Sequence, residues 1–296
     1  MTFLCLFGII EVDNKRKETM NYLKEYEERM YNAIKEIPDE YQESGQISGS
    51  KVAQPALTAI LTMLGVEKGF DNYTLAKFMR GHDVERLFVE RVFGKPKDVD
   101  EFGTWTKDNS SFTWQYDIDD GYMGSTCSID VLEKVRKDNP CNYEYIIHEI
   151  KSVGKMKYDR VAGTGFRKGE PAPDISHCLQ VSLYALSLDT DYKKRVLIHY
   201  VNADDYRVTS FEINPYDYKE ELDKRIDAIY IAFQTKQLPQ YVPYESWQKG
   251  KYNSFPELEN LSQDDVNSYV KTHYPEAYEK FMSSEVTEGG GISYEK

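Results

Sequence analysis

Tyr143-Glu-Tyr-Ile-Ile-His-Glu-Ile-Lys-Ser-Val153 is the stretch of sequence that decides the fold. Tyrosine and isoleucine dominate it, and residues of these types favour strands, so the stretch predicts a buried or half-buried β-strand. Side chains two residues apart in a strand point to the same face, so Glu149 and Lys151 are expected to lie side by side. Because burying two charges without a purpose is costly, this pair predicts a functional site.

A second acid, Asp130, lies in an earlier predicted strand, Tyr122-Met-Gly-Ser-Thr-Cys-Ser-Ile-Asp-Val-Leu132. If the two strands are neighbours, the carboxylates of Asp130 and Glu149 converge on one divalent cation. Magnesium and manganese prefer such oxygen ligands. A lysine beside the cation would stabilise charge on a transferring phosphoryl group or help to activate a water. The alternative is a surface ion pair between Glu149 and Lys151 without a chemical role.

Two further elements complete a pattern. Gln180-Val-Ser-Leu-Tyr184 lies in a predicted helix, where residues four apart share one face. Together with Asp130 and Glu149-Ile-Lys151, it resembles the PD-(D/E)XK nuclease superfamily, in particular the RecB-like branch that includes CRISPR-adaptation nucleases and phage exonucleases. That branch also carries a histidine on an upstream helix, and His82 fits this place. The resemblance covers residues 47–240.

The resemblance implies a metal-dependent DNA nuclease, in particular an exonuclease acting in recombination, repair or phage DNA replication. The implied ligands of Mg²⁺ or Mn²⁺ are Asp130, Glu149, the backbone carbonyl of Ile150 and His82, and the implied catalytic residues are Asp130, Glu149, Lys151, Gln180 and Tyr184. Glu85 is the alternative ligand from the same helix as His82, because residues three apart lie on one helix face. Gln180 is expected to place the lysine or the attacking water, and Tyr184 to buttress the site or touch substrate.

A basic segment follows the predicted strand. The side chains expected to contact phosphates there are Lys155, Lys157, Arg160, Arg167 and Lys168, interleaved with glycines in a predicted loop. Tyr158 and Phe166 are candidates to stack on bases. The alternative is an ordinary solvated loop with a chance cluster of basic residues.

Composition limits the function. The chain has 296 residues and a formal net charge of -13, which argues against a protein that coats DNA electrostatically. Its four cysteines form no metal-binding spacing, which favours a reducing cytoplasm and predicts no iron–sulfur cluster, unlike part of the family. The apolar N-terminal segment is too short to span a bilayer. The implied setting is a bacterial or phage-infected cell, and the implied partners are DNA and a helicase, recombinase or single-strand-binding protein.

The predicted fold class is α/β, with a restriction-endonuclease-like core in which helices flank a central mixed sheet and further helices are added at both ends. Apolar periodicity predicts helices over residues 14–36, 50–64, 72–93, 174–188, 215–236 and 262–282, and strands over residues 111–117, 122–132, 143–153, 195–201 and 206–213.

The expected organisation is an N-terminal arm and helix (1–45), a nuclease core (46–240), a helical extension (241–284) and a disordered tail (285–296). The alternatives to a DNA nuclease are a catalytically silent binding or assembly module and an RNA-directed nuclease.

Overall fold

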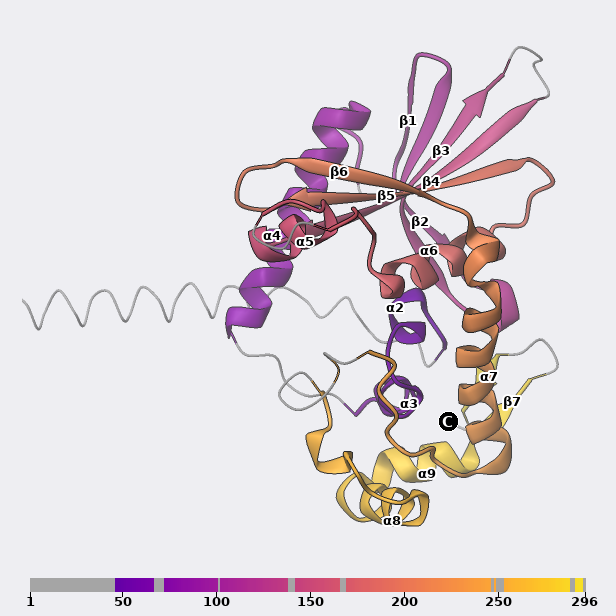
Figure 1. Cartoon of the computed structure of the whole chain (residues 1–296). Helices are drawn as coiled ribbons and strands as arrows, with labels where there is room; N and C mark the ends of the chain where they lie inside the picture. Colours follow the sequence, from indigo (N-terminus) through magenta and orange to yellow (C-terminus); the bar gives the residue numbers. More distant parts are fainter. Residues whose placement is uncertain are drawn as a thin grey trace, which may run out of the picture. The chain divides into compact units, whose positions relative to one another are not determined.

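Figure 1 shows the computed structural model of the chain, which describes residues 46–66, 72–100, 102–137, 142–165, 169–245, 248, 253–287 and 291–294. The chain divides into two compact units, Met1–Gln42 with Gly69–Arg80, and Glu43–Lys68 with Gly81–Lys296. The sheet and the candidate site residues belong to the second unit. The N-terminal strand or arm and the helix predicted over residues 14–36 lie outside the described residues.

A mixed sheet forms the centre of the second unit. Its strands are β1 (Thr104–Lys107), β2 (Ser110–Ile118), β3 (Cys127–Arg136), β4 (Tyr143–Val153), β5 (Lys193–Asn202) and β6 (Val208–Ile213), in the spatial order β1-β2-β3-β4-β5-β6. Neighbouring strands are antiparallel except β4 and β5, which are parallel. A parallel pair needs a crossover connection, and here the connection contains α5 (Lys155–Val161) and α6 (Ile175–Ser187). The predicted α/β class with a mixed sheet is confirmed.

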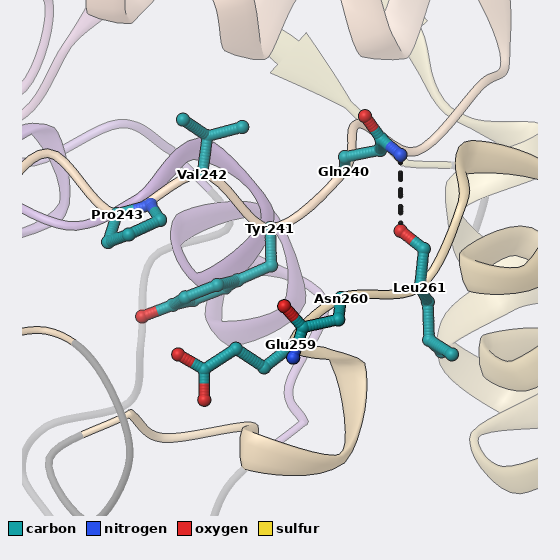
Figure 2. Close-up of a pocket in the computed structure, with 7 residues that line it drawn as sticks. All are labelled: Gln240, Tyr241, Val242, Pro243, Glu259, Asn260 and Leu261. Carbon is teal, nitrogen blue, oxygen red and sulfur yellow. Dashed lines mark hydrogen bonds between the residues drawn. The ribbon is translucent and has the colours of Figure 1, made fainter.

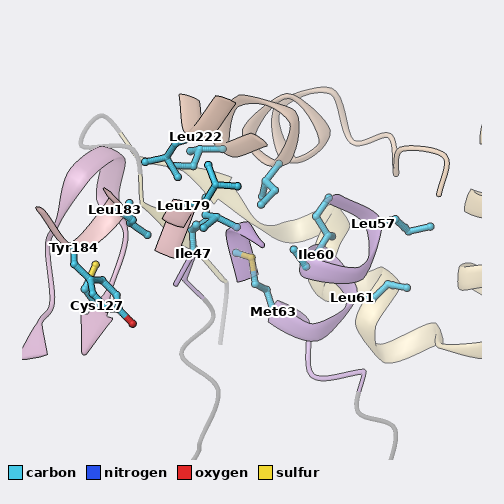
Figure 3. Packing of buried hydrophobic residues seen from close by; sticks show 14 of the residues in the cluster. Ile47, Leu57, Ile60, Leu61, Met63, Cys127, Leu179, Leu183, Tyr184 and Leu222 are labelled. Carbon is cyan, nitrogen blue, oxygen red and sulfur yellow. The ribbon is translucent and has the colours of Figure 1, made fainter. Parts of the chain in front are cut away.

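Both faces of the sheet are buried. On one face, Leu179 and Leu183 of α6 pack in a cluster with Leu222 of α7 (Lys219–Thr235) (Figure 3). Ile147 of β4 belongs to the same cluster. On the other face, Ile150 of β4 belongs to a second cluster. Its partners there include Val131 of β3, Val84 and Phe88 of α4 (Asn72–Phe88), and Val89 and Phe93 of the π-helical turn η1 (Val89–Phe93). A strand covered on both faces reads as a nearly continuous apolar run, which explains why β4 is recognisable from sequence.

Two predicted helices are each broken in two at a proline. The helix predicted over residues 50–64 is α2 (Gly49–Val52) followed by α3 (Ala56–Met63), and Pro55 lies between them. The helix predicted over residues 262–282 is α8 (Gln263–His273) followed by α9, which begins at Pro275 and ends at Ser283. Proline has no backbone N–H and its ring clashes with the preceding turn, so a helix restarts at proline instead of continuing through it.

Shorter elements complete the fold. They are the 3₁₀ turns η2 (Tyr122–Gly124), η3 (Pro215–Tyr218) and η6 (Pro256–Leu258), and the two-stranded hairpin of β7 (Glu285–Val286) and β8 (Ile292–Ser293). The disorder predicted for the tail is wrong for its described residues, because Ile292 is buried in the same cluster as Phe281. Strand β1 precedes the strand predicted over residues 111–117 and has no counterpart among the predicted strands, and η2 replaces the start of the strand predicted from Tyr122. None of the helices in the described ranges is both long and apolar enough to cross a bilayer.

Candidate active site

The site lies where β3 and β4 separate. The ladder that joins them ends at the pair Val131 and His148, although β4 continues to Val153. Asp130 and Glu149 occupy the next position beyond that pair, so the register places them opposite each other. The Ile150 N–H donates a hydrogen bond of 2.6 Å to Asp130 Oδ2. If the ladder between β3 and β4 were longer, a backbone carbonyl of β3 would accept from this kind of donor instead of a side chain. Two acids therefore face each other at the fork between the strands.

Glu149 and Lys151 form a buried ion pair, as the strand pattern predicts. Glu149 is 1% exposed, and its Oε1 contacts Lys151 Nζ. Apart from this ion pair, neither carboxylate oxygen of Glu149 has a hydrogen-bond partner among the described residues. Burial raises the pKa of Glu149, although the charge of Lys151 opposes this shift. One cationic partner offsets only part of the cost of burying this carboxylate, so the site favours an additional cation near Glu149.

Asp130 experiences the same environment. Burial raises its pKa well above the ordinary value, and the negative charges of Glu149 and Glu85 raise it further. Burial alone would lower the pKa of Lys151, but the charges of Glu149 and Asp130 outweigh this and raise it. Lys151 therefore remains positively charged between acids that repel one another.

A third acid approaches from α4. Glu85 Oε1 accepts hydrogen bonds from Trp114 Nε1 (3.2 Å) and Gln115 Nε2 (2.7 Å), which hold it beside β2. Burial raises the pKa of Glu85, and the charge of Glu149 adds to the shift. His82 lies one turn earlier and is exposed, with its ring centroid 6.5 Å from that of Trp114. Glu85 acts electrostatically on Asp130 and is itself acted on by Glu149, which supports Glu85 as a ligand from this helix.

The acids fit a hard divalent cation only with help from other ligands. Within the residues that the structure describes, no group of three or more His, Cys, Asp or Glu side chains is arranged to hold a metal ion by itself. Asp130 and Glu149 supply carboxylate oxygens, and among the described residues those of Glu149 have no hydrogen-bond partner besides Lys151. Magnesium usually keeps several waters and binds through one or two carboxylates plus substrate phosphates. Asp130, Glu149, the Ile150 carbonyl and water are therefore a sufficient ligand set, with Glu85 next to it.

One face of α6 covers the acids. Gln180 Nε2 donates a hydrogen bond of 2.6 Å to Tyr184 OH. Tyr184 is buried, and burial, together with the charges of Glu149 and Asp130, raises its pKa well above the ordinary value. The structure thus brings the predicted Gln180–Tyr184 pair together next to the acids. α2 packs against this pair so closely that a Cβ on Gly49 would lie 2.8 Å from Gln180 Cγ and 2.8 Å from Tyr184 Cε1.

His177 is a residue of this face that the sequence analysis did not assign to the site. It precedes Gln180 by three positions, and its Nδ1 lies 2.7 Å from the hydroxyl of Tyr200, the residue that pairs with Lys151 in the ladder between β4 and β5. Burial lowers the pKa of His177 well below its ordinary value, and the charges of Lys151 and nearby basic residues lower it further. The spacing of three residues from Gln180 was the available signal, since it places both side chains on one helix face.

The basic segment differs from the predicted loop. Its first part is the helix α5, and Lys157 and Arg160 form ion pairs of 2.6 and 2.8 Å with Asp174, which precedes α6. Tyr158 is 4% exposed and its hydroxyl lies 3.0 Å from Thr209 Oγ1, so the prediction that it stacks on bases is wrong. Lys155 is exposed. The remaining predicted contacts, Phe166, Arg167 and Lys168, lie outside the described residues.

A separate hollow lies in the C-terminal part of the chain (Figure 2). Two segments, residues 240–243 and 259–261, line a cavity of about 300 Å³. Gln240 Nε2 donates a hydrogen bond of 3.2 Å to the carbonyl oxygen of Leu261 across it. None of the acids or α6 residues described above lines this hollow.

Comparison with known proteins gives little further information. No family model matches the chain, and no curated protein matches it. Among solved structures, the crystal structure of SSO0001 aligns with 75% of this chain and 91% of its own chain, at 14% sequence identity and a TM-score of 0.39. The function proposed for this protein therefore rests on its own residues.

Proposed function

We propose that this protein is a metal-dependent nuclease that hydrolyses phosphodiester bonds in DNA. The observation that carries the proposal is the pair of facing acids, Asp130 and Glu149, at the fork between β3 and β4, with Lys151 two residues beyond Glu149 on the same face. Perturbed pKa values cluster at functional sites, so these buried acids with raised pKa values beside a lysine support a catalytic role.

The chemistry follows from the charges. A bound Mg²⁺ or Mn²⁺ would lower the pKa of a coordinated water and neutralise the phosphate, and Asp130, Glu149 and the Ile150 carbonyl are the groups that would hold it. Lys151 carries a positive charge toward the same space, where it supports the attacking oxygen or the charge that develops on the phosphate. In the reaction, oxygen from water forms a bond to phosphorus while the bond to the departing sugar oxygen breaks, and that oxygen gains a proton. Tyr184 and Gln180 exclude bulk water from the buried side of Glu149.

The resemblance to RecB-like nucleases favours an exonuclease that acts in recombination, repair or phage DNA replication. DNA is then the macromolecular partner, and a helicase, a recombinase or a single-strand-binding protein is the kind of protein that would work beside it. An RNA-directed nuclease would use the same acids, so competition between DNA and RNA oligonucleotides distinguishes the two substrates.

The direct test is cleavage of end-labelled single- and double-stranded DNA with manganese, magnesium or a chelator. Metal-dependent degradation by the wild type, reduced at least a hundredfold in Lys151→Ala, is the expected result, since removing one electrostatic catalyst typically costs on the order of 10²–10³ in rate. The product ladder gives the direction of digestion. Full activity of Lys151→Ala would show that the assignment of this lysine is wrong.

A second candidate is a catalytically silent nuclease-fold module that binds protein partners. One observation favours it, namely the formal charge of -13, which suits protein partners better than a nucleic acid. Metal binding separates the two candidates. A nuclease site gives a thermal shift with manganese that disappears in Asp130→Asn, because a ligand that binds only the folded state stabilises it. A folded wild type with no shift and no cleavage would favour the silent module.

A further inference from the structure

The hydroxyl of Tyr200 fixes the position of one proton beside the candidate site. Tyr200 is 0% exposed, so this hydroxyl has no access to bulk water. It accepts a hydrogen bond of 3.0 Å from the backbone N–H of Asp174, and it lies 2.7 Å from His177 Nδ1. Among the described residues these are its two polar contacts.

The direction of the hydrogen bond between Tyr200 and His177 follows from the donors and acceptors that each group has. The phenol carries a single proton, and a buried hydroxyl proton without an acceptor costs about 1–3 kcal/mol. The Asp174 N–H is itself a donor, so the acceptor for this proton is His177 Nδ1. A neutral imidazole has one protonated nitrogen, and therefore Nε2 carries the ring proton. Nε2 has no hydrogen-bond partner in the part of the chain that the structure describes.

The surroundings of this N–H donor favour an anion. Tyr200 pairs with Lys151 across the ladder from β4 to β5, so His177 lies near the lysine of the candidate site. The charges that act most strongly on His177 are those of Lys151, Lys157 and Arg160, all positive. Lys157 and Arg160 are held by Asp174. His177 therefore offers a neutral, fixed donor in a positive field, beside two basic side chains that are already paired.

We propose that His177 is a substrate-contacting residue whose Nε2–H donates a hydrogen bond to a phosphate oxygen of the nucleic acid strand next to Lys151. Tyr200 is its positioning residue, because its hydroxyl selects the tautomer. The inference rests on the proposed function, in that it takes the ligand of the site to be a phosphodiester backbone.

The test compares His177→Leu with His177→Gln. Leucine removes the donor and keeps an apolar side chain of moderate size, whereas the amide nitrogen of glutamine reaches about as far as Nε2 and restores a donor. The readout is the Kd for a fluorescent single-stranded oligonucleotide in the presence of calcium, which is used here to support binding without cleavage. Loss of one hydrogen bond to a charged group weakens binding by about tenfold to a hundredfold. We expect that loss in His177→Leu and recovery to within about threefold of wild type in His177→Gln.

Tyr200→Phe tests the positioning role separately. The ¹⁵N chemical shifts of His177, one of five histidines, report which ring nitrogen carries the proton. The wild type is expected to show the Nε2–H tautomer and Tyr200→Phe a mixture, with a Kd several-fold weaker. Unchanged binding in a folded His177→Leu would overturn the inference, as would an Nδ1–H tautomer in the wild type or a failure of the wild type to bind the oligonucleotide. Binding that depends on His177 in a protein that cleaves no substrate with manganese would support this inference while contradicting the proposed nuclease activity.

Discussion

Gln115 and Asp130 face each other at a break in the ladder between β2 and β3. The pairs on both sides, Trp114 with Val131 and Tyr116 with Ile129, are in register, whereas Gln115 and Asp130 do not pair. Gln115 has a φ of 50°, in the left-handed region that residues with a Cβ rarely adopt.

The break reverses the face of both strands. Residues two apart in a regular strand share a face, yet Trp114 and Val131 pack in one core cluster while Tyr116 and Ile129 pack in or against the other. The reversal frees the Asp130 carboxylate to reach the Ile150 N–H of the next strand. Backbone strain of this kind costs about 1–3 kcal/mol and is found most often at functional sites.

Gln115 also connects the break to the third acid. Its Nε2 donates to Glu85, and its Oε1 accepts a hydrogen bond of 3.0 Å from Ser128 Oγ. Gln115→Asn keeps a residue that tolerates the left-handed conformation but has a side chain too short to hold Glu85. We expect the free energy of unfolding in urea to change by less than about 1 kcal/mol, because one exposed or half-buried hydrogen bond contributes roughly that amount. We expect DNA cleavage to fall severalfold. A large loss of stability with cleavage unchanged per folded molecule would show that Gln115 acts only in folding.

Glu85 and His82 form a matched pair for the third ligand. Because Glu85 is within electrostatic reach of Asp130 and Glu149 and His82 is exposed, Glu85→Gln is expected to weaken Mn²⁺ binding more than about tenfold, a typical effect of losing a partner at a metal site. His82→Asn is expected to change it by less than about threefold. Isothermal titration with MnCl₂ measures both. The opposite order would support His82, the ligand that the family resemblance implies.

The buried acids predict how stability depends on pH in the absence of metal. Burial raises the pKa of Asp130 in the folded state above its unfolded value, and the charges of Glu149 and Glu85 add to this shift. Since the folded state binds the proton more tightly, the contribution of Asp130 is fully present below its unfolded pKa and is lost as pH rises through the folded pKa. Asp130→Asn removes this loss.

Thermal unfolding in EDTA measures that difference. We expect the melting temperature of Asp130→Asn to exceed that of the wild type by a few degrees at pH 8 and by less at pH 4. In a chain of this size, a stability difference of about 1 kcal/mol shifts the melting temperature by roughly 2–4 °C. Manganese should reverse the order, because it stabilises only the wild type. A mutant less stable than the wild type in EDTA at pH 8 would mean that Asp130 is held by donors instead of repelled by its neighbouring acids.

The sequence predicted what depends on local pattern and missed what depends on tertiary contacts. β4 is recognisable because both faces are apolar, and the common face of Glu149 and Lys151 follows from strand geometry alone. Pro55 and Pro275 indicate helix breaks, but apolar periodicity continues across both prolines and predicted one helix where there are two. The conformation of Gln115 carries no such signal, because glutamine is not a residue that favours positive φ. The role proposed for His177 depends on its contact with Tyr200, and the parallel pairing of β4 and β5 places Tyr200 beside Lys151.

Gly49 tests how tightly the helix bearing Gln180 and Tyr184 must be packed. A Cβ at this position would lie 2.8 Å from both side chains, a distance that real Cβ atoms do not tolerate. Gly49→Ala therefore forces α2 or the Gln180–Tyr184 pair to move, and overpacking of this kind typically destabilises by about 1–3 kcal/mol. Because Tyr184 covers Glu149, we expect cleavage per folded molecule to decrease as well.

Gly81→Ala, in α4, is the control. A Cβ at this position meets no atom within 4 Å, and alanine in a helix is favoured over glycine by about 1 kcal/mol. Urea unfolding should show a loss of stability in Gly49→Ala and a gain in Gly81→Ala. DNA cleavage per folded molecule should fall only in Gly49→Ala. Equal stability of Gly49→Ala and the wild type would mean that α2 does not restrain this face of α6.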